Sequence, residues 1–243
     1  MSDAKRKQAK LVLKRKLFHM LFVSFMLVPF LVELKIGEYM ISYIQYFSIL
    51  LGFAVVVNVT LVRMPEIRDE IIKQSRLFRR QFTEIMTSFK PARGMAELIE
   101  KFDESLTRFE DMLIREISLL ERDYEKRGGY IGMVAGAASI LIVASFLPEF
   151  LLPSILTLFT IDVVSAIVGA VFGRLFLPYS TSTLEGCIFG AIAFLPVALN
   201  YMEMWNAVFI SFTLAFVEAY SIEDNFFLPI SCALLMYAIS LFK

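Results

Sequence analysis

Ionisable side chains are rare in the apolar stretches of this sequence, and those present are the first candidates for chemistry. A buried charge costs about 2.5–3.5 kcal/mol on membrane-insertion scales, so such a residue marks a functional site by default. The ionisable residues within or at the ends of these stretches are His19, Asp162, Arg174, Glu185, Glu218, Glu223 and Asp224, with Asn58 and Asn225 as neutral polar additions.

The acidic residues among them favour a divalent cation. Glu218, Glu223 and Asp224 fall within seven residues, and a helix cap explains only one of them. Mg²⁺ is held by one or two carboxylates together with substrate phosphates. Acids accompanied by Arg174 therefore predict a charged nucleotide as one substrate.

Several of these positions also have a purely structural interpretation. Ser165, Gly169 and Gly173 share a helical face with Asp162, which is typical of close helix packing in membranes. The hydroxyl-rich loop 177–184 precedes Glu185, and either Ser182 or Thr183 caps the next helix or its N-terminus binds an anion. His19 is an interfacial histidine or a contact for a phosphate or base. Both interpretations stay open for each residue.

The composition predicts the elements that must position these residues. Hydrophobic residues make up 58% of the 243 residues and charged residues 20%, against about 45–50% and about 25% in soluble domains. Of the charges, 28 fall in residues 63–127, 14 of each sign. This distribution excludes a soluble globular domain, a disordered chain and a nucleic-acid-binding protein. It predicts an all-α, polytopic membrane protein with one inserted segment.

About seven transmembrane helices are expected, because a helix needs about 20 apolar residues to cross the bilayer. Seven basic residues in 1–16 place the N-terminus in the cytosol. Counting from there places Arg174, Glu185, Glu218 and Asp224 at cytosolic ends. Asp162 lies about three helical turns before Arg174, so a broken helix or a deep cavity is expected there. The candidate spans are 17–32, 39–62, 130–147, 150–173, 187–202, 205–217 and 226–242.

The inserted segment 63–127 has the pattern of a cytosolic helical hairpin. Its second arm repeats apolar residues with an eleven-residue period. Pro91 and Gly94 lie in the turn that separates the two arms. The hairpin offers a surface for a homo-oligomer. The expected organisation is 1–62 with two spans, 63–127 as the hairpin, and 128–243 with five spans and the functional motifs.

Four motifs in order resemble the CTP-dependent polyprenol kinase family, which includes dolichol kinase, phytol kinase and CTP-using diacylglycerol kinase. The family has Arg-Lys-x-x-His, then Asp-x-x-Ala with spaced glycines, then Lys-Ser-x-Glu-Gly, then a Glu followed by Asp-Asn and a Pro. The sequence departs from this pattern with Ile161 in place of a Gly, Ser165 in place of Ala and Ser182 in place of Lys. The matching residues are Arg15, Lys16 and His19; Asp162, Gly169 and Gly173; Thr183, Glu185 and Gly186; and Glu218, Asp224, Asn225 and Pro229.

The resemblance implies an integral membrane kinase that moves the γ-phosphoryl of CTP to a long isoprenoid alcohol such as dolichol. Its cytosolic site would use Mg²⁺, and the lipid would enter from the bilayer. The implied catalytic residues are Asp162, Glu185 and Asp224, and Glu218 joins them as a metal ligand. The implied nucleotide or phosphate contacts are Arg15, Lys16, His19, Gly169, Gly173, Arg174, Ser182, Thr183, Gly186 and Asn225.

Two alternatives remain open at this point. A CTP:lipid cytidylyltransferase would use the same acids and Mg²⁺ but release pyrophosphate. A small transporter or scaffold would need no chemistry at all, although paired repeats typical of transporters are not evident in the sequence.

Overall fold

The structure, a computed structural model, describes residues 3–36, 39–63, 77 and 131–242. The regular structure of this part is helical apart from one short pair of strands and an isolated bridge between Phe176 and Thr183, so the expected all-α class is confirmed. The chain divides into two units, one combining Met1–Val55 with Tyr130–Lys243 and the other formed by Val56–Gly129. The predicted hairpin over 63–127 lies outside the described residues, apart from Arg63 and Leu77.

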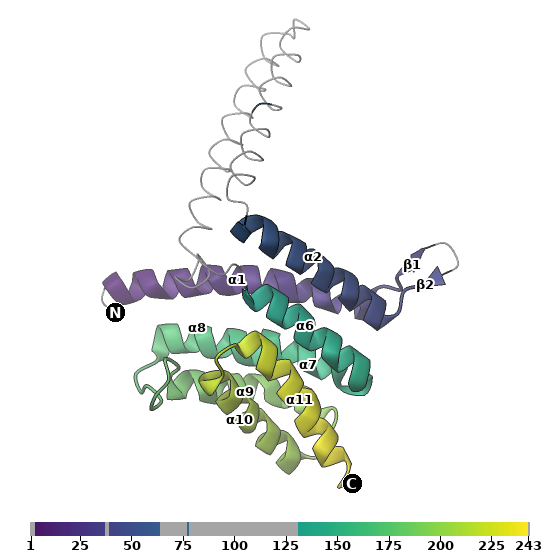
Figure 1. Ribbon diagram of the computed structural model, residues 1–243. Helices are drawn as coiled ribbons and strands as arrows, with labels where there is room; N and C mark the ends of the chain where they lie inside the picture. The colour runs from purple at the N-terminus through teal and green to yellow at the C-terminus, as the bar shows by residue number, and fades with distance from the viewer. Residues whose placement is uncertain (1–2, 37–38, 64–76, 78–130, 243) are drawn as a thin grey trace, which may run out of the picture. The chain divides into compact units, whose positions relative to one another are not determined.

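The order of elements is shown in Figure 1. A 3-10 turn at Pro148–Phe150 leads into α7, and a π-helical turn at Leu158–Asp162 joins α7 to α8. The elements are α1 (Asp3–Leu31), β1 (Lys35–Ile36), β2 (Tyr39–Met40), α2 (Tyr43–Arg63), α6 (Ile131–Phe146), α7 (Leu151–Thr157), α8 (Val163–Phe172), α9 (Leu184–Leu199), α10 (Met204–Tyr220) and α11 (Asp224–Ser240).

The start of α2 differs from the expectation that a span begins at Tyr39. Tyr39 instead pairs with Ile36 in the antiparallel strands, and the helix begins at Tyr43. The Ser42 hydroxyl accepts a hydrogen bond from the Gln45 backbone N–H at 3.3 Å, and Gln45 Oε1 accepts one from the Ser42 N–H at 3.0 Å. This reciprocal capping box satisfies two free donors and sets the start of the helix.

Each predicted span overlaps a described helix, but only one described helix has both the length and the apolar composition to cross a bilayer. It is the continuous segment Pro148–Phe172, which includes the π-helical turn. The other apolar segments span 10–17 residues each, and they are Tyr43–Val59 within α2 and the helices α6, α9, α10 and α11. The helical character of the spans is therefore confirmed, and the number of crossings stays a prediction.

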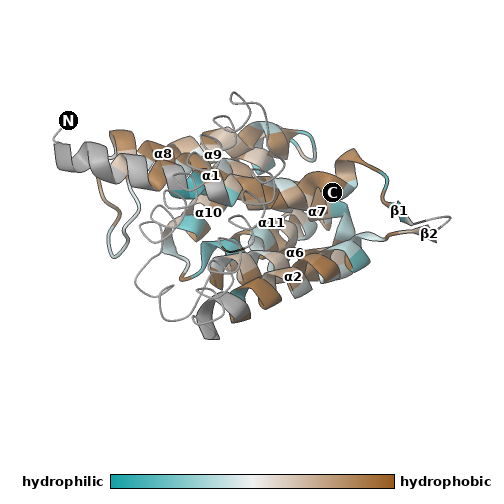
Figure 2. Ribbon diagram, turned by 90° about the horizontal axis from the view of Figure 1, so that it is seen from above, coloured by the Kyte–Doolittle hydropathy of each residue, from teal (hydrophilic) through white to brown (hydrophobic). Residues whose placement is uncertain are grey.

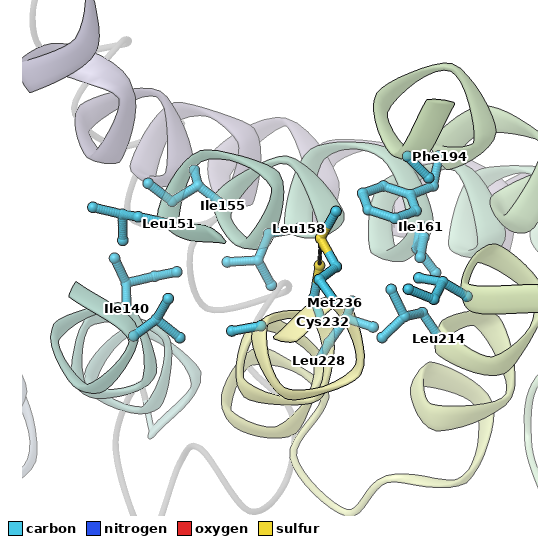
Figure 3. Close-up of a cluster of buried hydrophobic side chains, with 14 of the residues drawn as sticks. Ile140, Leu151, Ile155, Leu158, Ile161, Phe194, Leu214, Leu228, Cys232 and Met236 are labelled. Carbon is cyan, nitrogen blue, oxygen red and sulfur yellow. Dashed lines mark hydrogen bonds between the residues drawn. The ribbon is translucent and has the colours of Figure 1, made fainter. Parts of the chain in front are cut away.

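The core of the first unit is apolar and includes residues from both ends of the chain, among them Val23 and Met236. Figure 3 labels several of its members between Ile140 and Met236. Cys232 and Met236 place their sulfur atoms 3.6 Å apart in this core. The largest fully buried side chains include Phe47, Ile140, Leu158, Phe194 and Leu214.

Large apolar side chains also cover the outside of the described helices. Phe146 is 78% exposed, Phe172 is 68% exposed and Trp205 is 83% exposed. Much of the described helical ribbon is coloured hydrophobic in Figure 2. A monomer in water rarely exposes large contiguous apolar patches.

Helices α8 and α9 approach each other closely where their residues are small. A Cβ atom built on Gly186 would lie 2.5 Å from the Ser165 carbonyl oxygen. One built on Gly190 would lie 2.3 Å from Ser165 Oγ and 3.2 Å from the Ile161 carbonyl oxygen. Because Ser165 Oγ already donates to that carbonyl oxygen of Ile161 at 2.6 Å, it has little freedom to move. The two backbones therefore need glycine at both positions.

We expect Gly190→Ala to lower the stability of the protein by about 1–3 kcal/mol, because the new methyl group overpacks this contact. Thermal unfolding in detergent would measure the change. Gly52→Ala is the matched control, since nothing lies within 4 Å of a Cβ at Gly52. Equal transition temperatures for the two variants would contradict the close approach of α8 and α9.

Candidate functional site

Three carboxylates from separate elements converge in the first unit. Asp162 ends the π-helical turn, Glu218 lies two residues before the end of α10, and Asp224 is the first residue of α11. One carboxylate oxygen from each lies within 4.8 Å of the other two. We call these three residues the acidic triad. All three were among the four metal ligands expected from the sequence.

The π-helical turn carries Asp162 at its end. Asp162 is 1% exposed, and Leu158 and Ile161 from the same turn are fully buried. A π-helical turn inserts an extra residue into a helix and is frequent at functional sites. Of the broken helix or deep cavity expected at Asp162, the break is not observed, because the helix continues through this π-helical turn. Asp162 lies about 15 Å along the helix before the end of α8 at Phe172, at 1.5 Å per residue. The C-terminal end of α10 and the N-terminal end of α11 meet it at this depth.

Helix α1 supplies the positive charge opposite the triad. The Lys16 ammonium donates to Asp162 Oδ1, and the side chains of Lys16 and Asp162 are 6% and 1% exposed. His19 Nε2 lies 3.1 Å from Asp162 Oδ2, without the alignment of a hydrogen bond. Lys16 and His19 are one helical turn apart, so both face the same carboxylate. Arg15, next to Lys16, is half-buried.

The triad fits a small divalent cation. Asp162 Oδ2 and Glu218 Oε2 are buried and receive no hydrogen bond from the described residues. Opposite oxygen ligands of one Mg²⁺ are about 4.2 Å apart, since each Mg–O bond is about 2.1 Å. The 4.8 Å limit on the triad is close to this span. Three carboxylates this close repel one another, and a cation would offset that repulsion.

The start of α11 places Glu223 and Asn225 on either side of Asp224. The Asn225 backbone N–H donates to Asp224 Oδ1 at 2.9 Å, and Asn225 Nδ2 donates to Glu223 Oε1 at 3.4 Å. Asn225 Oδ1 is buried and receives no hydrogen bond from the described residues. The Nδ2 group of Asn225 is therefore engaged, whereas its Oδ1 atom is available as an acceptor beside Asp224.

Glu185, the fourth expected metal ligand, is not in the triad. Its carboxylate accepts hydrogen bonds from the backbone N–H groups of Arg174 at 3.1 Å and Leu175 at 3.3 Å. Glu185 precedes the span expected at 187–202. Its own backbone N–H, followed by that of Arg174, lowers the pKa of the Glu185 carboxyl below its ordinary value. Through these hydrogen bonds the Glu185 carboxylate closes the loop after α8. The side chain of Arg174, in the same loop, is exposed.

The loop between α8 and α9 is held at both ends. The Thr183 hydroxyl caps α9 by accepting from the Gly186 N–H at 3.2 Å, which confirms one of the two caps considered from the sequence. Ser180 Oγ donates to the Ala219 carbonyl oxygen at 2.6 Å, next to Glu218. The Ser182 backbone N–H donates to Ser180 Oγ at 3.0 Å. The loop therefore reaches the end of α10, beside one member of the triad.

The expected glycine contacts serve packing in the structure. A Cβ at Gly169 would lie 2.9 Å from Thr183 Oγ1, and one at Gly173 would lie 2.6 Å from Thr183 Cγ2. This bears out the packing interpretation of the small-residue face. Their contact with a phosphate, and that of Ser182, Thr183 and Gly186, stays a prediction.

Sequence reasoning missed residues that support the site from a distance. Ser180 holds the loop, Gly190 extends the packing of Gly186 by one turn, and Gly132 and Ser139 on α6 contact the start of α11. The signals of these residues in the sequence are the four-residue spacings of Gly186 with Gly190 and of Gly132 with Gly136. Comparison with family models, with curated proteins and with solved structures finds no match for the chain.

Proposed function

We propose that the chain is an integral membrane kinase that transfers the γ-phosphoryl of CTP to the hydroxyl of a long isoprenoid alcohol. The observation that carries the proposal is the meeting of Lys16 and His19 with the acidic triad. The resemblance names these residues from motifs at opposite ends of the chain, and the structure brings them to one place. The N-terminus and the site would face the cytosol.

The exposed apolar surface supports membrane embedding. Large apolar side chains are exposed on every helix longer than seven residues in the described part of the chain, as expected where lipid replaces water. The hydroxyl of the lipid would then approach the triad while its tail stays among the acyl chains.

The residues have the chemistry that phosphoryl transfer requires. This reaction depends on positioning and on neutralising charge rather than on covalent catalysis by the protein. Asp162, Glu218 and Asp224 would hold Mg²⁺, which neutralises phosphate charge when bound. Lys16 and His19 would contact phosphate oxygens, and Arg15 and Arg174 would add positive charge at the rim.

The transfer exchanges one bond to phosphorus for another. The lipid oxygen forms a bond to the γ-phosphorus as the bond to the β-γ bridging oxygen breaks, so that CDP leaves. The hydroxyl proton passes to a carboxylate of the site. Glu185 would act through the loop that it closes, because its oxygens already accept backbone hydrogen bonds.

The test uses two labels of CTP on membranes that contain the protein and a panel of polyprenols. A kinase transfers the γ label to lipid and releases CDP, and we expect this result. A cytidylyltransferase joins CMP to a lipid phosphate, so with polyprenyl phosphates added to the panel it places the α label in lipid and releases pyrophosphate. Membranes that contain Asp162→Asn protein serve as the control. Transfer of neither label to any alcohol in the panel would contradict the proposal and favour a transporter or scaffold.

A further inference from the structure

Helix α6 approaches the start of α11 through small residues that no motif includes. Ser139 Oγ lies 3.0 Å from the Asn225 carbonyl oxygen and 2.9 Å from that of Gly136. A Cβ at Gly132 would lie 2.7 Å from Asn225 Nδ2 and 3.3 Å from Glu223 Oε1. Gly132, Gly136 and Ser139 therefore form one face of α6 against the turn that carries Asp224 and Asn225.

The contacts of the Asn225 side chain indicate what this face of α6 does. Its Nδ2 group lies over Gly132 and donates to Glu223, while its Oδ1 atom is buried with no hydrogen bond from the described residues. A buried amide oxygen without a donor destabilises a fold, which indicates that a ligand completes it here. The neighbouring residue, Asp224, belongs to the triad.

We propose that Gly132 is a positioning residue of the site, and this rests on the proposed function. Its missing side chain leaves room for the Asn225 amide, so that Nδ2 lies toward α6 and Oδ1 is left for bound nucleotide. Ser139 holds the backbone of the same residue. A methyl group at position 132 would displace the amide, which is the free end of a side chain, and would leave the helices in place.

Equilibrium binding of labelled CTP with Mg²⁺ to the full-length protein in detergent tests the proposal. We expect Gly132→Ala to raise the Kd about tenfold, and to raise KM far more than it changes kcat. Gly136→Ala is the matched control, one turn along the same face. There the nearest atom to a new Cβ is Met26 Cε at 3.6 Å, an ordinary contact, so the Kd should stay within about twofold of wild type.

A double variant separates positioning from general disturbance. Asn225→Ala removes the amide, so adding Gly132→Ala to it should change the Kd no further. If Gly132→Ala fails to fold, Ser139→Ala takes its place, and the loss of its hydrogen bond should raise the Kd about fivefold.

The outcomes distinguish this inference from the function on which it rests. Wild-type protein that neither binds CTP nor transfers phosphate would overturn the proposed function. Wild-type protein that binds CTP, with Gly132→Ala equal to Gly136→Ala or additive with Asn225→Ala, would overturn the role of Gly132 alone.

Discussion

Asp162→Asn is expected to lower CTP-dependent phosphorylation of a polyprenol by about 10²–10³-fold, the loss typical when one preorganised electrostatic group is removed. Asparagine keeps the size of the side chain and its contact with Lys16 but loses the charge that would offset Mg²⁺. Turnover on membranes and Mn²⁺ binding by electron paramagnetic resonance would measure the effect.

The fold should survive this substitution. The triad has three carboxylates against Lys16, so removing one lowers their repulsion while Glu218 and Asp224 still balance the lysine. Glu149→Gln is the matched control, since Glu149 is an exposed acid in the turn before α7. Near-wild-type turnover in Asp162→Asn would contradict the role of Asp162 and most of the case for a kinase.

In contrast to Asp162→Asn, the substitution Lys16→Met should lower the stability of the protein. It leaves Asp162 buried without its ammonium partner, and breaking a buried pair in this way costs about 3–5 kcal/mol. The matched control is Lys35→Met. Lys35 pairs with Glu33 at the surface, with side chains 48% and 72% exposed, so its loss should cost less than about 1 kcal/mol. Unfolding in detergent with a chelator present would compare the two variants.

Added Mg²⁺ should restore part of the stability of Lys16→Met, and should stabilise it more than wild type, because the cation replaces a missing charge. The double variant Lys16→Met with Asp162→Asn should be more stable than Lys16→Met alone, since neither charge of the pair remains. Equal losses for Lys16→Met and Lys35→Met would show that the buried pair contributes nothing to the fold.

Local signals in the sequence predicted the helices well. The apolar stretches gave the helical segments, and hydroxyl residues before Leu184 predicted a cap that Thr183 provides. Apolar content alone predicts that α2 starts at Tyr39. The sequence also contains the Ser-x-x-Gln pattern of a capping box at Ser42 and Gln45, and this box marks the observed start at Tyr43.

The meeting of distant residues was only partly predictable. Rarity of charge in apolar stretches selected Asp162, Glu218 and Asp224, and the expected topology brought the last two to one side. The pairing of Lys16 with Asp162 depends on how α1 packs against the π-helical turn, and no local pattern encodes that packing. The family resemblance implies that Glu185 joins the triad, whereas the direction of its side chain depends on the loop after α8.

The two partners of the buried pair are 146 residues apart in the chain, and this has a consequence for biosynthesis. At about 5–20 residues per second, Lys16 leaves the ribosome roughly 7–30 seconds before Asp162 does. Glu218 and Asp224 follow later still. If the chain inserts into a membrane as proposed, the first helix of the nascent chain would keep its lysine hydrated or held by lipid headgroups during that interval. Completion of the charged centre is therefore a late event in synthesis, and it depends on α1 remaining free to dock until the last helices arrive.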